Sequence, residues 1–197
     1  MTAVMQMARD ERQILSNIVR GGDVLILGNA RMGKTLLAQL LEKTFQEADR
    51  RVCVLDSLGS WSAGLSTRRV LRWHQGQGKV LESGFGNSLT TVWNYQGHSL
   101  PRGLLDLGIY DDVILDDWRG VGCPALDGGR PRRVVLTQLL DDTLERHIWR
   151  YVIVFNLRFA REISFARRWG GQGLTNLGWG LAVLLQNGLP PQSLRFR

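Results

Sequence analysis

In the stretch VLILGNARMGKT, residues 24–35, an apolar run of strand length stops at a glycine and is followed, after four further residues, by Gly-Lys-Thr. Gly28, Gly33, Lys34 and Thr35 fit the pattern G-x-x-x-x-G-K-[ST] of a phosphate-binding loop. Glycines let the backbone bend, so that successive N–H groups converge on phosphate oxygens at the N-terminus of the next helix. The stretch therefore predicts a strand, a phosphate-binding loop and a helix in direct succession.

The residue types in this loop indicate a nucleoside triphosphate. Lys34 is expected to reach the β- and γ-phosphates, and the hydroxyl of Thr35 to coordinate Mg²⁺. Arg31, inside the loop, adds charge at the nucleotide or faces a neighbouring subunit. The sequence has no Asn-Lys-x-Asp motif, with which guanine-specific switches read the base, so we expect ATP with Mg²⁺. The residues expected to bind the nucleotide are Gly28, Asn29, Ala30, Arg31, Met32, Gly33, Lys34, Thr35 and Leu36.

A second apolar run, in DVILDD at residues 112–117, ends in a pair of acids. Asp116, at the carboxyl end of this expected strand, would lie beside the magnesium shell, as a metal ligand together with Thr35. Asp117 is in position to orient or deprotonate an attacking water, although many hydrolysing relatives have glutamate there. Asp111 and Asp112 begin the same strand, so we expect them at the far edge of the sheet and in contact with solvent.

Strand-length apolar runs alternate with amphipathic segments along the chain. Strands are expected at 23–28, 50–56, 110–117, 151–156 and 180–186, with one or two short strands within 76–99. Helices are expected at 10–20, 33–48, 66–75, 100–108, 134–150 and 159–170, with a loop over 118–133. This order predicts an α/β fold, a P-loop NTPase three-layer α/β/α sandwich with a mainly parallel central sheet. We expect residues 1–197 to form a single ATPase domain, with an N-terminal helical segment at 1–21 and the core at 22–197.

The composition points to a polyanionic partner. The net charge is +7, and nearly all of the positive charge is arginine, which binds phosphate bidentately. A basic chain can also simply be soluble, and GC-rich coding alone would favour arginine.

The two cysteines and three histidines lack the spacing of a zinc site, and the seven tryptophans are expected in the core or at interfaces. No apolar run reaches the roughly 18 residues of a spanning helix, so we expect a soluble, intracellular protein.

Residues 23–64 resemble the opening of an ATPase of the FtsK/HerA superfamily. In that group a second strand ends in Asp, followed by a Gly and an acidic or aromatic position, which are Asp56, Gly59 and Trp61 here. The Walker B strand in VILDDW follows, and then a strand that ends in a polar sensor, Asn156, where glutamine is usual. The ending LLQNGLPPQSLRFR is similar to the short Pro-containing tail of the small genome-packaging ATPases of tailless, membrane-containing double-stranded DNA viruses.

This resemblance implies a fold of the ASCE/RecA-like type and an enzyme that couples ATP hydrolysis to translocation of double-stranded DNA. It implies a homo-oligomeric ring, usually a hexamer, that contacts the phosphate backbone of the DNA without recognising the base sequence. The expected role is the packaging motor of a viral genome in the host cytoplasm. Association with the virion, through capsid or vertex proteins, is a further expectation of the resemblance.

A ring motor needs an arginine from a neighbouring subunit at the transferring phosphate. The candidates follow the sensor strand: Arg158 and Arg161, with Arg167 and Arg168 further on, although each of them can equally solvate a helix. DNA contact requires positive charge on loops that line a channel. Ordinary surface charge explains the candidate arginines nearly as well; they are Arg68, Arg69, Arg72, Arg119, Arg130, Arg132 and Arg133.

Two other functions fit the same loop. A small-molecule or nucleotide kinase would use the arginine-bearing segment 119–133 as a lid, although nothing in the sequence indicates an acceptor pocket. A nucleotide-binding switch or assembly factor would bind ATP and hydrolyse little. Hydrolysis stimulated by DNA distinguishes the motor from both alternatives.

Overall fold

The computed structural model describes residues 9–61, 68–74, 78–84, 88–95, 106–118 and 131–195 of the chain. The strands are β1 Val24–Leu27, β2 Val52–Asp56, β3 Arg68–His74, β4 Lys79–Gly84, β5 Thr90–Asn94, β6 Asp112–Asp116, β7 Arg132–Thr137, β8 Tyr151–Val154, β9 Leu181–Leu185 and β10 Gln192–Arg195. The helices are α1 Arg9–Val19, α2 Lys34–Glu47, α3 Asp142–Arg146 and α4 Ala160–Arg168, with a 3₁₀ turn at Leu107–Ile109.

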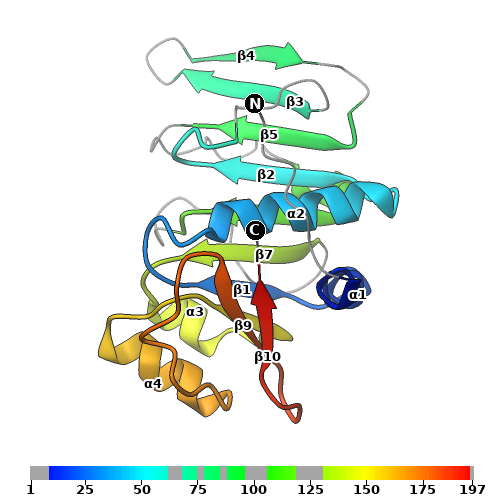
Figure 1. Ribbon diagram of the computed structural model, residues 1–197. Helices are drawn as coiled ribbons and strands as arrows, with labels where there is room; N and C mark the ends of the chain where they lie inside the picture. Colours follow the sequence, from blue (N-terminus) through cyan, green and yellow to red (C-terminus); the bar gives the residue numbers. More distant parts are fainter. Residues whose placement is uncertain are drawn as a thin grey trace.

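All of these strands belong to one sheet in the order β10-β9-β8-β1-β7-β6-β2-β5-β3-β4 (Figure 1). The strands from β8 to β3 pair in parallel, and the edges are antiparallel, with β4 on β3 at one side and β9 and β10 at the other. Every residue of β1, β2 and β8 is buried, as expected for continuous apolar strands covered on both faces. The sheet confirms the predicted α/β fold class.

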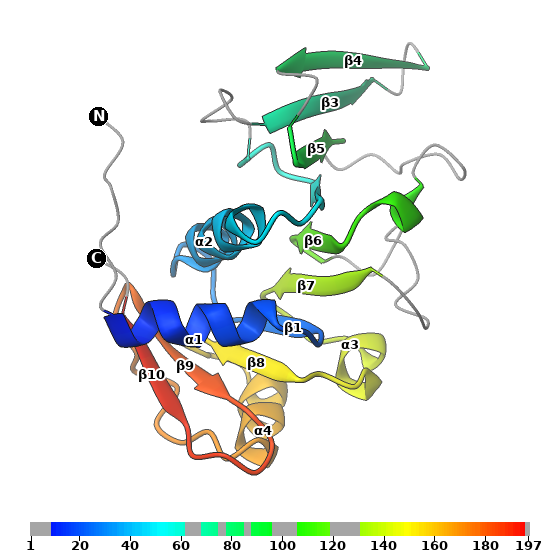
Figure 2. The ribbon, with the colours of Figure 1, turned by 90° about the vertical axis from the view of Figure 1, so that its right-hand side faces the viewer.

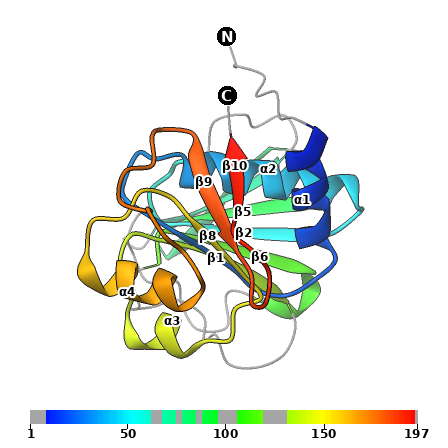
Figure 3. The ribbon, with the colours of Figure 1, turned by 60° about the horizontal axis from the view of Figure 1, so that its bottom comes forward.

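Helices cover both faces of the sheet. Figures 2 and 3 show α1 and α2 on one face and α3 and α4 together on the other. On the first face, Leu15 and Ile18 of α1 and Phe45 of α2 share a core with side chains of the central strands. On the second face, Leu144 of α3 and Phe165 of α4 pack in a separate core. The arrangement is the expected three-layer sandwich. Within the described ranges, no helix is both long and apolar enough to pass through a membrane.

The helix predicted over residues 66–75 is wrong, because residues 68–74 form β3 between β5 and β4. Val70 joins the core under α2, Leu71 joins the core of the opposite face, and Arg72 is exposed. Neighbours that point to opposite faces are typical of a strand. A short run of apolar and basic residues does not separate helix from strand by periodicity alone, and pairing on both sides decides for the strand.

The helix predicted over residues 134–150 is also wrong for most of its length. Residues 132–137 form β7, which lies between β1 and β6, and only residues 142–146 form a helix, α3. The β-branched side chains of Val134, Val135 and Thr137 are buried in this central strand. The carboxylate of Asp141 accepts a hydrogen bond from the N–H of Leu144 at 2.8 Å. This N-cap places the start of α3 at residue 142, eight residues after the start of the predicted helix.

Two smaller predictions also change. The helix expected over 100–108 is described only from residue 106, where Leu107–Ile109 form a 3₁₀ turn. The proline-containing ending was not assigned a strand, but residues 192–195 form the edge strand β10, antiparallel to β9. Most of the loop expected over 118–133, residues 119–130, lies outside the described residues.

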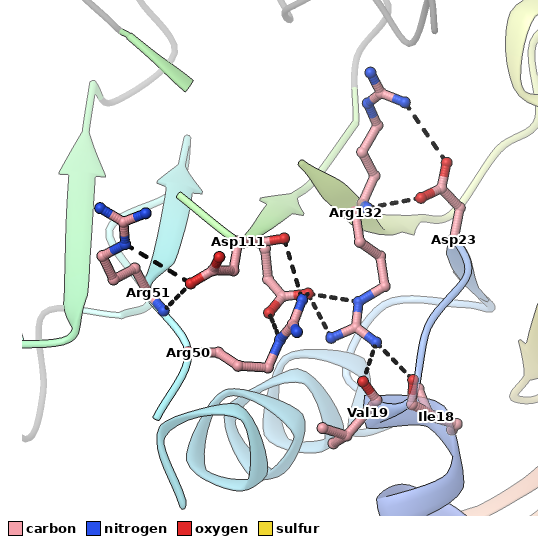
Figure 4. A network of polar contacts seen from close by, with 9 residues as sticks. Ile18, Val19, Asp23, Arg50, Arg51, Asp111 and Arg132 are labelled. Carbon is pink, nitrogen blue, oxygen red and sulfur yellow. Dashed lines mark hydrogen bonds and ion pairs between the residues drawn. The ribbon is translucent and has the colours of Figure 1, made fainter. Parts of the chain in front are cut away.

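The prediction that Asp112 is solvated is wrong. Asp112 is fully buried at the amino end of β6, where its carboxylate accepts a hydrogen bond from Nε of Arg50 at 2.6 Å and pairs with Arg132. Nη1 of Arg132 also donates to the carbonyl oxygens of Ile18 at 2.6 Å and Val19 at 2.9 Å, at the end of α1 (Figure 4). Arginine at a helix C-terminus satisfies carbonyls that have no partner in the helix. The network therefore fixes α1 to the sheet.

Two further acids, Asp111 and Asp23, accept hydrogen bonds at the same edge. Asp111 accepts a hydrogen bond from the backbone N–H of Arg51 at 2.8 Å, and its carboxylate is half-exposed, so only this acid of the pair meets solvent (Figure 4). Asp23 accepts from the backbone N–H of Arg133 at 2.8 Å and lies 2.7 Å from Nε2 of His147. These acids thus form hydrogen bonds at the amino ends of the strands, on the edge of the sheet opposite to the phosphate-binding loop.

Candidate nucleotide site

The phosphate-binding loop joins the carboxyl end of β1 to the first residue of α2. At Gly28 an added Cβ would lie 2.6 Å from the Cβ of Phe155, so only glycine allows this close approach. Gly33, the N-cap of α2, has a φ of 102°, a left-handed conformation that glycine adopts without strain. No side chain of the described residues caps α2, and N–H groups at an uncapped helix N-terminus after a glycine-containing loop are suited to binding an anion.

Lys34 is folded over the loop. Its Nζ donates to the carbonyl oxygens of Gly28 at 2.8 Å and Asn29 at 2.7 Å. Burial lowers the pKa of Lys34 to about 8, against the opposing influence of Asp116 and Asp117. A phosphate anion bound beside the ammonium group would therefore raise this pKa and favour the charged form.

Thr35 and Asp116 come together from different elements. Oγ1 of Thr35, in the first turn of α2, lies 3.4 and 3.3 Å from the two carboxylate oxygens of Asp116 at the end of β6. Burial raises the pKa of Asp116, and hydrogen bonds to its carboxylate oppose that rise. A hydroxyl and a carboxylate are the hard oxygen donors that Mg²⁺ prefers, and Mg²⁺ is held by few protein ligands together with water and substrate phosphates. The residues present therefore fit the expected cation.

Two donors to Asp116 were not among the predicted site residues. Oγ of Ser60 lies 2.8 Å from Oδ2 of Asp116, and Nε1 of Trp61 lies 2.6 Å from the same oxygen. Both residues belong to the turn after β2, and the resemblance had pointed to Trp61 only as an aromatic position. A signal was present in the sequence, because parallel strands such as β2 and β6 bring their carboxyl ends to one edge.

Asp117 and Asn156 flank the loop. Asp117 has a φ of 65°, unusual for a residue other than glycine, and it is close enough to Lys34 to affect the pKa of that lysine. The backbone oxygen of Asn156 accepts from the N–H of Asn29 at 3.1 Å, and its Nδ2 donates to Leu177. In the described part of the chain its buried Oδ1 has no hydrogen-bond partner. The structure thus brings the predicted base and the predicted sensor to the same edge as the loop.

The arginines after β8 differ in their surroundings. Arg161 forms ion pairs with Asp142 and Glu145 of α3, and Arg168 pairs with Glu145. Arg158 is exposed, and no ion pair or hydrogen bond holds its side chain within the described ranges. Arg158 thus lacks the ion pairs that hold Arg161, which would have to leave two carboxylates to reach a neighbour.

The predicted DNA-contacting arginines divide in the same way. Arg132 is buried against Asp112, so the prediction that it meets DNA is wrong. The side chains of Arg68 and Arg133 are 12% and 11% exposed and form ion pairs with Glu42 and Asp23, so they belong to the fold as well. The more exposed candidates are Arg69, which pairs with Glu82, and Arg72, whereas Arg119 and Arg130 lie outside the described residues.

Comparison with protein-family models and with the sequences of curated proteins found no match. Among solved structures, the chain is similar to the genome packaging NTPase B204 from Sulfolobus turreted icosahedral virus 2. The complex with AMPPCP has a TM-score of 0.57 at 10% identity, over 88% of this chain and 97% of that chain. The complex with sulfate has a TM-score of 0.58 at 12% identity, over 87% and 94%. The complex with ATP-gammaS has a TM-score of 0.56 at 10% identity, over 88% and 96%.

At this level of identity the likeness shows the fold. The chain shares the fold of the protein B204 over most of its length. This confirms, for the fold, the resemblance that the motifs indicated.

Proposed function

We propose that the chain is an ATP-hydrolysing translocase of double-stranded DNA and acts as the genome-packaging motor of a virus. The observation that carries this proposal is the contact of Thr35 with Asp116 at the mouth of the phosphate-binding loop. It occurs in a fold shared with a packaging NTPase that was solved with AMPPCP and with ATP-gammaS. The packaging function of that protein supports the same function here.

In this proposal the loop residues 28–36 bind the triphosphate through backbone N–H groups, and Lys34 moves from the loop carbonyls to the β- and γ-phosphates. Thr35 and Asp116 hold Mg²⁺, which when bound neutralises charge on the phosphates. The exchange of loop carbonyls for phosphate oxygens keeps the lysine hydrogen-bonded in both states. The free loop is therefore prepared for the anion.

Asp117 orients the attacking water or accepts its proton, and Asn156 offers as the polar sensor its Oδ1, which has no hydrogen-bond partner among the described residues. A second subunit supplies an arginine to the transferring phosphate, with Arg158 as the first candidate and Arg161 as the second. An arginine supplied in this way contributes roughly 10³–10⁵ to kcat in NTPases that use one. This requirement favours a homo-oligomeric ring, for which the resemblance implies a hexamer.

The remaining expectations follow from the motor. Arg69 and Arg72 on β3, with Arg119 and Arg130, are proposed to meet the phosphate backbone of the duplex without reading its sequence. Residues 1–197 are proposed to form one ATPase domain that works in the host cytoplasm. Docking of the ring on capsid or vertex proteins is part of the same proposal.

The test is steady-state ATP hydrolysis by the purified protein with and without long double-stranded DNA, with Lys34→Ala as control. The motor predicts hydrolysis that rises strongly with DNA, releases inorganic phosphate and is lost in Lys34→Ala. Hydrolysis indifferent to DNA would refute the motor. Phosphate transfer to a small acceptor would favour a kinase, and tight binding without turnover would favour a switch.

A further inference from the structure

The carboxylate of Asp116 is held asymmetrically. Its Oδ2 accepts hydrogen bonds from Oγ of Ser60 at 2.8 Å and from Nε1 of Trp61 at 2.6 Å. The hydroxyl of Thr35 lies at similar distances from both oxygens, 3.4 Å from Oδ1 and 3.3 Å from Oδ2, and among the described residues Oδ1 has no other hydrogen-bond partner. One oxygen is therefore saturated by protein donors, whereas the other keeps lone pairs on the side of the phosphate-binding loop.

The turn that carries these donors is itself fixed. Asp56, fully buried at the end of β2, accepts at Oδ1 from the backbone N–H groups of Leu58 at 3.3 Å, Gly59 at 2.8 Å and Ser60 at 3.1 Å. Its Oδ2 accepts from the N–H of Trp61 at 3.1 Å. Asp56 also lies directly opposite Asp116 in the pairing of β2 with β6. The register of the sheet thus sets the distance from the turn to Asp116.

Trp61 is held from its other side by Arg68, the first residue of β3. The guanidinium group of Arg68 lies 5.2 Å from the centre of the Trp61 ring, and Nη1 donates to the carbonyl oxygen of Trp61 at 3.3 Å. Arg68 also forms an ion pair with the buried Glu42 of α2. Lys34 and Thr35 are the first two residues of α2. The helix that follows the phosphate-binding loop is therefore linked to Asp116 in two ways: directly through Thr35, and through Glu42, Arg68 and Trp61.

We propose that Ser60 and Trp61 are positioning residues for the magnesium-binding carboxylate, which hold Oδ2 of Asp116 so that Oδ1 stays open to the hydration shell of a cation beside Thr35. The terminal torsion of an aspartate is broad and has no strong preference of its own. Hydrogen bonds to a carboxylate that assists a metal commonly set its orientation and affect metal affinity. This inference rests on the proposed function and adds the residues that prepare its metal site.

The substitution Trp61→Phe removes the N–H donor and keeps an aromatic ring in the core, but it also leaves unfilled the volume of the smaller ring of the indole, because Trp61 is fully buried. A control of the same size change therefore has to separate positioning from packing. Ser60→Ala removes the other donor, and since Ser60 is exposed we expect this variant to fold even if Trp61→Phe does not. The matched control is Trp149→Phe. Trp149 is buried and donates from Nε1 to the carbonyl of Leu144 at 2.8 Å, in α3 and away from Asp116.

The measurement is the affinity for Mn²⁺, read by electron paramagnetic resonance as loss of the free-ion signal, in the presence of a non-hydrolysable ATP analogue. Affinity for the same analogue in EDTA is measured in parallel. We expect Trp61→Phe and Ser60→Ala each to weaken Mn²⁺ binding about tenfold, the lower end of such effects. Binding of the analogue in EDTA should stay within about twofold of the wild type, and Trp149→Phe should change neither quantity.

Three results would overturn the proposal, and they are distinguishable. Unchanged Mn²⁺ affinity in both variants means that neither donor positions Asp116. An equal loss of analogue binding in EDTA means that the turn supports the fold of the loop rather than the metal ligand. If the wild type binds neither the analogue nor Mn²⁺, the proposed function itself fails, and the positioning role fails with it.

Discussion

Raising the pH above 8 should weaken nucleotide binding through a single group, the side chain of Lys34. Burial lowers the pKa of this lysine from 10.5 to about 8 in the free protein. A triphosphate beside the ammonium group favours the charged form and raises the pKa again. Above pH 8 the free loop has therefore lost a proton that the complex keeps, and binding must take up that proton. By linkage, affinity falls as the pH rises.

The expected magnitude follows from this shift. Each pH unit between the pKa of the free protein and that of the complex costs about tenfold in affinity. From pH 8 to pH 10 the dissociation constant of a non-hydrolysable ATP analogue should thus rise on the order of a hundredfold. Below about pH 7 the lysine is protonated in both states, so it contributes no pH dependence there.

Isothermal titration calorimetry in EDTA, in two buffers of different ionisation enthalpy, measures both the affinity and the proton uptake. Lys34→Ala is the control: it binds more weakly, and its affinity should be flat between pH 8 and pH 10. An affinity of the wild type that does not change over this range would show that the protonation of Lys34 does not control nucleotide binding. The same slope in Lys34→Ala would show this as well, because another group would then be responsible.

Three further predictions address the fold, the subunit contact and the DNA contact. Asp112→Ala should lower the free energy of unfolding by about 3–5 kcal/mol in urea titrations, because it leaves the buried guanidinium of Arg132 without its carboxylate; a loss well under 1 kcal/mol would contradict this. Arg158→Ala should lower kcat at least about 10³-fold with analogue binding unchanged, and near-normal turnover would exclude Arg158 as the arginine supplied to a neighbour. Arg72→Ala should weaken binding to duplexes of any sequence and reduce the slope of log affinity against log salt by about 1, whereas an unchanged slope would place Arg72 outside the DNA contact.

The phosphate-binding loop could be read from the sequence because its chemistry is local. Gly28, Gly33, Lys34 and Thr35 lie within one short stretch, and the strand and helix around them have clear patterns. Asp116 could be placed beside them because the carboxyl ends of parallel strands share an edge. The contact of Thr35 with Asp116 agrees with that expectation.

The errors concern features that depend on distant partners. Asp112 is predicted to contact solvent, but it is buried and accepts a hydrogen bond from Arg50, 62 positions away along the chain. Trp61 donates to Asp116 across 55 positions; parallel strands bring the two segments to one edge of the sheet, but no spacing in the sequence identifies these two side chains as partners. The segment of β3 became a strand because β5 and β4 pair with it on both sides, a context that a seven-residue run does not reveal.

The most direct test of the central claim is translocation itself. A third DNA strand bound as a triplex on a long duplex is displaced when a motor moves along the duplex, and its release can be followed by fluorescence. We predict ATP-dependent release by the wild type, with a delay that grows with the distance to the triplex, and no release by Lys34→Ala. Absence of release by a protein that hydrolyses ATP and binds the duplex would show that it does not translocate along DNA.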